Sequence, residues 1–214
     1  MLPVCDVIPP RKTPFVLLAL IVACGAAFLY LRQLDVLDLI DLTYTAGVVP
    51  ASFEWTAVLT STVVHAGWIH AAANLLFLWI FGENVEDAMG HGPFLLFLMA
   101  GAVVTATAYQ ALDPSSISPL IGAGGPLAAI MGAYLAMYPR SQVLMVVFLV
   151  LRVDVVEAPA IVFPVFWLLL QIVDGFTPAI AHPSDVAGAL AAYGVAFAFG
   201  GLIGLFYRGR VWMR

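Results

Sequence analysis

The feature that most limits the fold of this sequence is a series of long apolar segments with almost no charged residues. A helix that crosses a bilayer needs about 20 mostly apolar residues. Hydrophobic residues make up 63% of this chain and charged residues 10%, whereas soluble domains are about 45–50% apolar. The sequence therefore predicts an integral membrane protein. The charge-poor windows are Pro14–Leu31, Trp55–Gly82, Pro93–Leu112, Pro119–Pro139, Ala158–Val173 and Val186–Tyr207.

The windows favour helices over a transmembrane barrel. Each is continuously apolar, whereas barrel strands alternate in polarity and run for only about 9–11 residues. The expected fold class is all-α, a polytopic bundle of six transmembrane helices in a single domain over residues 1–214. Residues 1–13 and 208–214 are expected to form a cytoplasmic N-terminal segment and a short cytoplasmic tail.

The segment Ser141–Glu157 fits this scheme poorly. Its apolar run, Val143–Leu151, is too short to span a bilayer and is followed by Arg152, Asp154 and Glu157. We expect it to be interfacial or to extend the neighbouring helices.

Basic residues predict the orientation, because Lys and Arg are retained on the cytoplasmic side. With the N-terminus inside, only Arg32 falls outside. The chain is therefore expected to have both termini in the cytoplasm, and no basic stripe indicates nucleic acid as a partner. The seven basic residues on the inner side are Arg11, Lys12, Arg140, Arg152, Arg208, Arg210 and Arg214.

Cysteine and acidic residues give little evidence of a further site. Cys5 precedes the first window and Cys24 lies inside it, which does not fit a disulfide framework. Cys24 follows a stretch similar to a lipoprotein cleavage site, but the apolar run continues beyond it, which argues against cleavage. Asp35, Asp38 and Asp41 share one face of a short helix and indicate a water-facing rim rather than a metal site. No metal or cofactor is expected.

Small residues at four-residue spacing form stripes in two of the windows. Such stripes let helix backbones approach closely in lipid. They predict that the fourth and sixth spans pack against each other or into equally tight grooves, which would bring Gly124 and Asp185 close together. The stripes are Gly124, Ala128, Gly132 and Ala136, and then Gly188, Ala192, Ala196, Gly200 and Gly204.

Several short motifs are spread along the chain. They are Pro9–Pro14, His65–His70 with Asn74, Phe81–Gly82 with Val85–Glu86 and Gly90, Ile121–Gly125, Gly132–Leu135, Tyr138–Arg140 and Phe166–Gln171. Together they resemble the bacterial branch of the rhomboid intramembrane serine protease family. The resemblance implies a six-helix bundle in the bacterial inner membrane, with a water-filled cavity open to the outside.

The family's catalytic dyad falls on residues that cannot perform its usual chemistry. The resemblance places the nucleophilic serine at Gly124 and the histidine base at Asp185. Glycine has no oxygen with which to form an acyl-enzyme. We therefore expect no catalytic residue and no enzyme activity, with Gly124 and Asp185 as vestigial dyad positions that remain part of a binding site.

Other family positions are retained. His70 and Asn74 match the oxyanion side of the family site, lie on one helix face and are expected to act as polar anchors for a bound segment. Glu86 matches a carboxylate that braces the loop before the second span, where Ala57 stands in place of the usual arginine. Glu86, Gly132 and Gly188 are expected to be structural.

Alternatives to a lost site remain open. A relocated dyad would need a new nucleophile with a base about 3 Å away. Metal binding by His65, His70 and Asp185 is disfavoured, because a spacing of five puts the histidines on different faces of a helix. His65 fits an interhelical hydrogen-bonding role better. The candidates for a relocated dyad are His182, Ser184, Ser115, Ser116 and Ser118.

Asp185 is the most informative remaining polar residue. A carboxylate near the bilayer usually faces the bundle interior, water or a partner. His70, His182 or a basic residue of another membrane protein could pair with it. The sequence thus predicts a rhomboid-like pseudoprotease that binds transmembrane helices of other proteins, either as an accessory subunit of a hetero-oligomeric membrane complex or as an assembly or quality-control factor. The alternative is an active protease with a relocated nucleophile.

Overall fold

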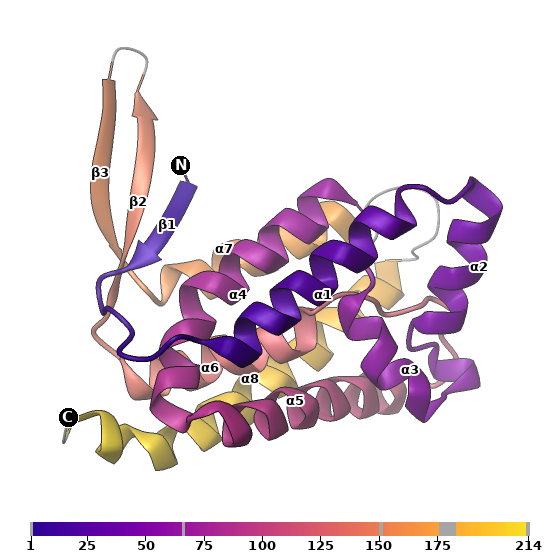
Figure 1. The fold of residues 1–214 in the computed structure, drawn as a ribbon. Helices are drawn as coiled ribbons and strands as arrows, with labels where there is room; N and C mark the ends of the chain where they lie inside the picture. The colour runs from indigo at the N-terminus through magenta and orange to yellow at the C-terminus, as the bar shows by residue number, and fades with distance from the viewer. Residues whose placement is uncertain (1, 66, 150–151, 176–182, 213–214) are drawn as a thin grey trace.

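Helices dominate the structure, a computed structural model that describes residues 2–65, 67–149, 152–175 and 183–212 (Figure 1). The described residues also form three strands and two short 3-10 helices. The sequence predicted an all-α fold, and the structure confirms a mostly helical one. In chain order the elements are β1 (Leu2–Asp6), α1 (Phe15–Leu31), α2 (Val36–Ala46), η1 (Pro50–Ser52), α3 (Trp55–Thr60), η2 (Ser61–Val63), α4 (Trp68–Met89), α5 (His91–Leu112), α6 (Gly124–Met137), β2 (Gln142–Leu149), β3 (Arg152–Pro159), α7 (Val162–Gly175) and α8 (Pro183–Trp212).

The helices differ in their capacity to cross a membrane. Within the described residues, His91–Leu112 and Val186–Gly209 are long and apolar enough, and a third span results if the bent pair Trp55–Val63 and Trp68–Met89 counts as one. Phe15–Leu31, Gly124–Met137 and Val162–Ile172 are shorter apolar helices. The count of six spans therefore stays a prediction.

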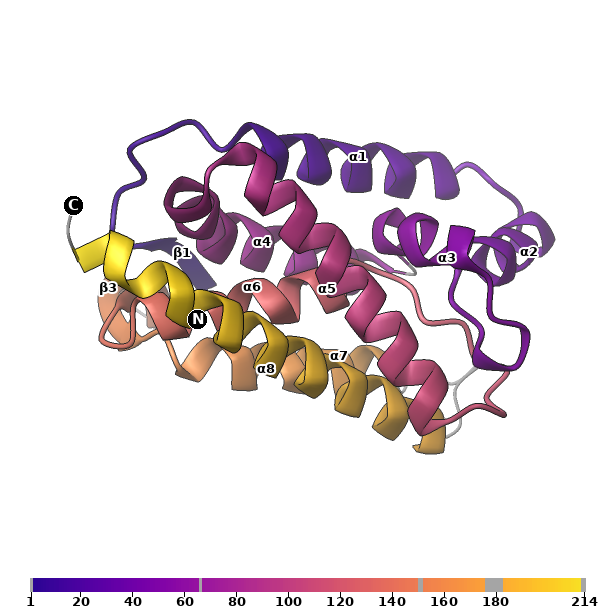
Figure 2. The same cartoon turned by 90° about the horizontal axis from the view of Figure 1, so that it is seen from below.

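Helices α6 and α8 pack closely, as their small-residue stripes predict (Figure 2). A methyl group built on Gly132 would collide with the Phe197 carbonyl, and one on Gly204 would lie 2.5 Å from the Ala133 carbonyl oxygen. Gly188 instead faces α5, where the added carbon would lie 3.2 Å from Tyr109. Glycine is thus required by close backbone approach along α8.

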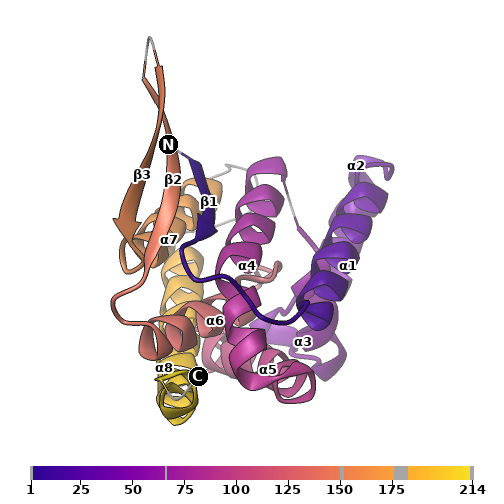
Figure 3. The same ribbon diagram turned by 60° about the vertical axis from the view of Figure 1, so that its left-hand side comes forward.

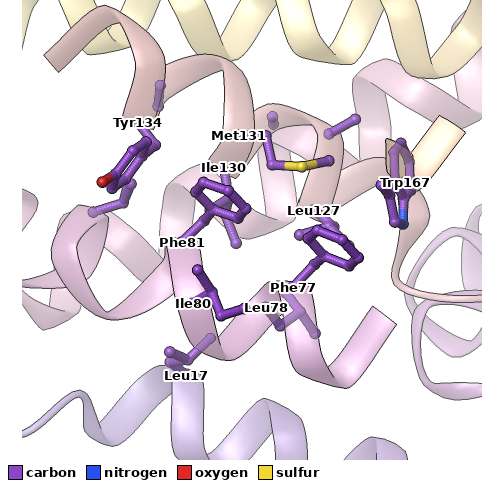
Figure 4. Packing of buried hydrophobic residues seen from close by; sticks show 14 of the residues in the cluster. Leu17, Phe77, Leu78, Ile80, Phe81, Leu127, Ile130, Met131, Tyr134 and Trp167 are labelled. Atoms are coloured by element: carbon purple, nitrogen blue, oxygen red, sulfur yellow. The ribbon is translucent and has the colours of Figure 1, made fainter. Parts of the chain in front are cut away.

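The core lies between α4 and α6 and is filled by large side chains (Figure 4). Phe81 contacts Tyr134 edge to face, with ring centroids 4.9 Å apart, and Phe77 contacts Phe163 of α7. Leu17 of α1 packs over Gly82, where an added carbon would lie 2.6 Å from it. The core therefore holds α4 against three other helices.

Glu86 fastens α1 to the end of α4. Its buried carboxylate accepts hydrogen bonds from the backbone N–H groups of Val16 (3.0 Å) and Leu17 (2.8 Å) and contacts His91 Nδ1 at 2.6 Å. These are the otherwise unpaired donors in the first turn of α1. The expectation that Glu86 braces the loop before the second span is wrong, because that loop precedes the other end of α4.

The loop before α4 is held by apolar packing instead. Ala57 is buried in a small cluster with Val48, Val58, Ala102 and Ala106. A long charged side chain would not fit among these residues, so the alanine suits this loop.

Beyond α6 the chain leaves the helical bundle as a β-hairpin, β2 and β3, onto which β1 adds as a third antiparallel strand. The fold is therefore not purely α, and the expectation that Ser141–Glu157 extends its neighbouring helices is wrong. Each residue of Gln142–Leu149 lies opposite one of Arg152–Pro159, so the backbone groups of this segment bond across strands. The hairpin projects from the bundle (Figure 3).

Asp6 attaches this sheet to the helices. Its carboxylate accepts hydrogen bonds from Asn84 Nδ2 (2.8 Å), Ser141 Oγ (2.9 Å) and the Tyr134 hydroxyl (2.5 Å). Burial outweighs these bonds and raises the pKa of Asp6 above its ordinary value of 3.8. One carboxylate thus joins β1 to α4 and α6.

Candidate functional site

The segment before α6, which the sequence aligns with the family nucleophile, is held by backbone contacts to the loop before α4. The Gly122 N–H donates to the Ser61 carbonyl (2.8 Å), and Leu120 and Val48 exchange backbone hydrogen bonds of 2.9 and 3.0 Å. The Ala123 N–H donates to His65 Nε2 (3.4 Å). The start of α6 is therefore fixed to the chain that precedes α4.

Gly122 needs to be glycine for two reasons. Its φ of +98° lies in the left-handed region that other residues rarely adopt. A carbon added there would also lie 2.6 Å from His70 Nε2 and 3.4 Å from Asn74 Nδ2. His70 and Asn74 therefore face the same glycine, as their spacing on one helix face predicts.

The two polar atoms of the Asn74 amide differ, because one is hydrogen-bonded within the protein and the other is available for binding. Its Oδ1 accepts a hydrogen bond from the Trp167 indole N–H (3.0 Å), which ties α4 to α7. Its buried Nδ2 has no hydrogen-bond partner within the described part of the chain. A buried donor of this kind is costly unless something accepts from it, so the amide is suited to binding a carbonyl oxygen.

Tyr193 fills the space beside Gly124. A side-chain carbon built on Gly124 would lie 2.8 Å from Tyr193 Cζ and 2.9 Å from its hydroxyl oxygen. The ring is almost fully buried and packs against Trp167, with centroids 5.3 Å apart. The space that a side chain at position 124 would need is thus occupied by a residue of α8.

This packing leaves little open volume next to the motif. Ser61, Thr105, Gly122, Gly125 and Tyr193 help to line a cavity of about 20 Å³. That volume holds about one water molecule. Within the described residues, this space is therefore small, and most of its other lining residues are apolar, among them Val58, Ala102 and Leu120.

His65 and His70 lie closer than the sequence spacing suggested. His65 precedes α4 instead of lying on it, and the two rings meet edge to face with centroids 5.1 Å apart. The argument that separate helix faces keep them apart is wrong. Since His65 Nε2 accepts from Ala123, its Nδ1 carries the proton and donates to the Val63 carbonyl (3.2 Å). His65 thus holds the loop that carries Gly122.

The other candidates for a base or nucleophile are only partly described. Asp185 lies in the first turn of α8, but its side chain and that of Ser184 are outside the described part of the structure, as is all of His182. Their predicted roles stay predictions.

The three serines of the loop after α5 bind within that loop. Ser116 Oγ contacts the Tyr109 hydroxyl (3.1 Å), and Ser115 Oγ donates to Asp113 Oδ1 (3.4 Å). Ser118 accepts from the Tyr109 hydroxyl through its carbonyl (3.2 Å). These three serines therefore bind their own loop and the end of α5.

Sequence reasoning missed Tyr193, Trp167 as the partner of Asn74, and Ser61. Tyr193 follows Ala192 of the predicted small-residue stripe, and a large polar residue there was a usable signal. Trp167 lay inside a motif already noted, but its partner was visible only once α4 and α7 were placed together. Ser61 contributes through its carbonyl, which no side-chain pattern reveals.

Comparison with known proteins agrees with this geometry. The rhomboid domain family model matches residues 52–202 of this chain. The chain belongs to the rhomboid family. Members of this family are multi-pass membrane proteins, consistent with the apolar helices described above.

Relatives with reviewed names include two rhomboid proteases. The chain is 36% identical over 96 residues to rhomboid protease GluP of Bacillus subtilis, covering 44% of this chain and 18% of that protein. It is 35% identical over 81 residues to rhomboid-like protein 11, chloroplastic, of Arabidopsis thaliana, covering 37% and 27%. It is 26% identical over 192 residues to rhomboid protease GlpG of Enterobacter sp., covering 88% and 64%. The chain thus spans less than two thirds of each of these relatives.

These relatives correct one expectation from the sequence. The absence of a serine at Gly124 led us to expect that the chain is not an enzyme. The relatives named as proteases instead point to a possible protease. Gly124 itself supplies no nucleophile, so such activity would require a hydroxyl from another residue.

Proposed function

We propose that this rhomboid protein binds a transmembrane segment of another membrane protein at the end of the bundle where Gly122, His70 and Asn74 meet, hereafter the site end. The observation that carries the proposal is the buried Asn74 amide, whose Nδ2 donor is left over once Trp167 has bound Oδ1. A segment that enters the bundle needs partners for its backbone carbonyls, because lipid supplies none. The Nδ2 group of Asn74 meets that need for one carbonyl.

Three further elements belong to this proposal. The bundle crosses the bacterial inner membrane six times, with both termini in the cytoplasm, as the basic residues predict. Asp185 pairs with a basic residue of the bound partner, since a carboxylate at this depth usually requires one. The partner is held within a membrane complex, either permanently or during assembly and quality control.

Binding is tested with the full chain in lipid nanodiscs and a fluorescent single-span polypeptide. Asn74→Leu removes the donor and is expected to weaken binding about tenfold, the value of a hydrogen bond to a buried group. Gly194→Ala is the control, because nothing lies within 4 Å of the added carbon. If no single-span probe binds the unaltered chain, or if Asn74→Leu binds as well, the proposal is wrong.

Partners in the cell are identified by purification from native membranes and mass spectrometry. Stoichiometric co-purification supports a permanent subunit, and substoichiometric recovery supports an assembly or quality-control factor. Asp185→Asn is expected to reduce retention of the partner. Unchanged retention would remove an intermolecular ion pair of Asp185 from the proposal.

Cleavage of the bound segment is a second candidate function, favoured by the names of the relatives. Among the described serines, Ser61 lines the cavity that also contains Gly122 and Gly125, which makes it the nucleophile to test first. A fluorophosphonate probe tests this directly. Labelling that disappears in Ser61→Ala, together with cleavage of a single-span substrate, supports this function. The absence of both labelling and cleavage argues against it.

A further inference from the structure

We propose that the outer edge of β3 binds an extended basic segment that flanks the transmembrane helix of the bound partner. This inference rests on the proposed function and adds a second contact to it, at the opposite end of the bundle. Apart from Ala158 and Pro159 at the end of β3, the sheet lies outside all six spans expected from the sequence.

The sheet lies at the end of the bundle that also holds the first turn of α1 and the last turn of α4, hereafter the sheet end (Figure 1). The hydrogen bonds of Asp6 to Asn84, Tyr134 and Ser141 fix it there. Figures 1 and 3 show the hairpin rising beside α4 and α7 and then beyond them. A helix bound in the bundle would leave the membrane close to this sheet.

The hairpin already accepts one extended segment. β1 comes from the far N-terminal part of the chain and pairs with β2 in antiparallel register, with Leu2 opposite Val146 and Asp6 opposite Val143. The order β1, β2, β3 leaves β3 at the other edge, and no described strand pairs with its outer side. An edge strand presents unpaired N–H and C=O groups that can template a further strand.

The side chains of β3 indicate what kind of strand fits. Val155 and Glu157 lie on one face and are exposed, while Asp154 and Val156 lie on the other. Between residues 154 and 157, each face therefore offers one carboxylate and one valine, and Arg152 at the other end of β3 leaves the whole strand with one net negative charge. Oppositely charged residues on neighbouring strands stabilise a sheet, and like charges destabilise it. A strand that alternates basic and apolar residues is the best match.

The membrane topology of a partner protein also favours a basic segment at this place. Lys and Arg gather in the cytoplasmic segments next to transmembrane helices. The sheet end is the cytoplasmic end in the proposed orientation. Anionic lipid headgroups are a poorer match for this edge, because its two carboxylates would be repelled by them.

The test uses the full chain in nanodiscs and four synthetic polypeptides with the same apolar helix. One has no flank, one ends in alternating Lys and Val, one has Pro in place of each Val, and one has Glu in place of each Lys. Proline keeps the charge but cannot donate the backbone hydrogen bonds of a sheet. The Lys-Val flank is expected to tighten binding about tenfold over the helix alone, the value of two charged cross-strand pairs. The Pro and Glu flanks should give no gain.

Reversal of the edge charges supplies the matched variant. In Asp154→Lys with Glu157→Lys, the Lys-Val flank should lose its gain and the flank with Glu should acquire it. The helix without a flank should bind this variant and the unaltered chain equally, which shows that the bundle is intact. Equal gains from the Lys-Val and Pro flanks would overturn strand addition, as would no gain from either.

Two further outcomes are kept apart by the same design. If the helix without a flank fails to bind, the proposed function is lost, while binding of the isolated Lys-Val peptide to the chain still decides the role of the edge. If light scattering shows that the chain dimerises and the charge reversal abolishes the dimer, β3 pairs with a second copy. That result would overturn a basic partner segment as its occupant.

Discussion

The two ends of the bundle differ in how their buried polar side chains are hydrogen-bonded. At the sheet end, Asp6 accepts three side-chain hydrogen bonds and Glu86 accepts two backbone hydrogen bonds and contacts His91. At the site end, Asn74 keeps a buried donor without a partner in the described residues. The first arrangement stabilises the fold, whereas the second leaves a polar group available for binding.

The comparison indicates where this protein can tolerate change. Removing a saturated carboxylate leaves several donors unpaired at once, each of which costs about 1–3 kcal/mol. Changing a group that already lacks a partner should lower the free energy of unfolding less, and should weaken the binding of a partner segment more. Mutations at the two ends should therefore separate folding from function.

The largest loss of stability is expected at the contact of α6 with α8, two helices that connect the site end with the sheet end. In Gly200→Ala the new methyl group would collide with the Ala129 carbonyl. We expect a loss of about 3 kcal/mol, the cost of overpacking against rigid backbone, measured by thermal unfolding in detergent. The control is Gly194→Ala on the same helix, where nothing lies within 4 Å and stability should rise slightly. Equal behaviour of the two variants would contradict the close approach.

The second largest loss of stability is expected at the sheet end, for Glu86→Ala. The change leaves the N–H groups of Val16 and Leu17 without their acceptor inside the protein. A loss of about 2–3 kcal/mol is expected by the same unfolding measurement. Glu157→Ala is the control, because that residue is exposed on β3 and should change stability little. A small effect of Glu86→Ala would mean that α1 is held by apolar packing alone.

The site end is tested by Gly124→Ser, a change at the position where the family resemblance predicts a serine. The hydroxymethyl group meets the ring of Tyr193, so a loss of about 2 kcal/mol is expected. Combining it with Tyr193→Ala should cost less than the sum of the single changes by about 1 kcal/mol or more, as for residues in contact. Additive costs in this double-mutant cycle would show that Tyr193 does not fill the serine's place. Gly194→Ser controls for serine in a helix.

The smallest effect is the pH dependence of β1 attachment. Burial raises the pKa of Asp6 in the folded chain, so the folded state binds its proton more tightly than the unfolded state does. The contribution of Asp6 to stability is then full below 3.8 and declines as pH rises through the higher folded value. Hydrogen exchange of the β1 amides, corrected for the intrinsic rate at each pH, should accelerate with rising pH across this window. Asp6→Asn should remove this dependence, and acceleration that persists in it would assign the effect to another group.

Much of the helical architecture was predictable because its signals are local. Apolar windows and four-residue stripes predicted membrane helices and the contact between α6 and α8. The spacing of His70 and Asn74 predicted that both would face one point, which is Gly122. The hairpin was missed because an apolar run such as Val143–Leu149 suits either a helix or a strand, and only its pairing with β3 and β1 makes it a strand.

The sequence by itself determined the family and the apolar helices, since both are written in residue identities and short spacings. The tertiary structure alone decided that Tyr193 fills the space beside Gly124, that Trp167 donates to one side of the Asn74 amide and that Glu86 accepts from the first turn of α1. These contacts join residues that are distant in the chain. They depend on how the helices are placed in space, and no local pattern encodes that placement.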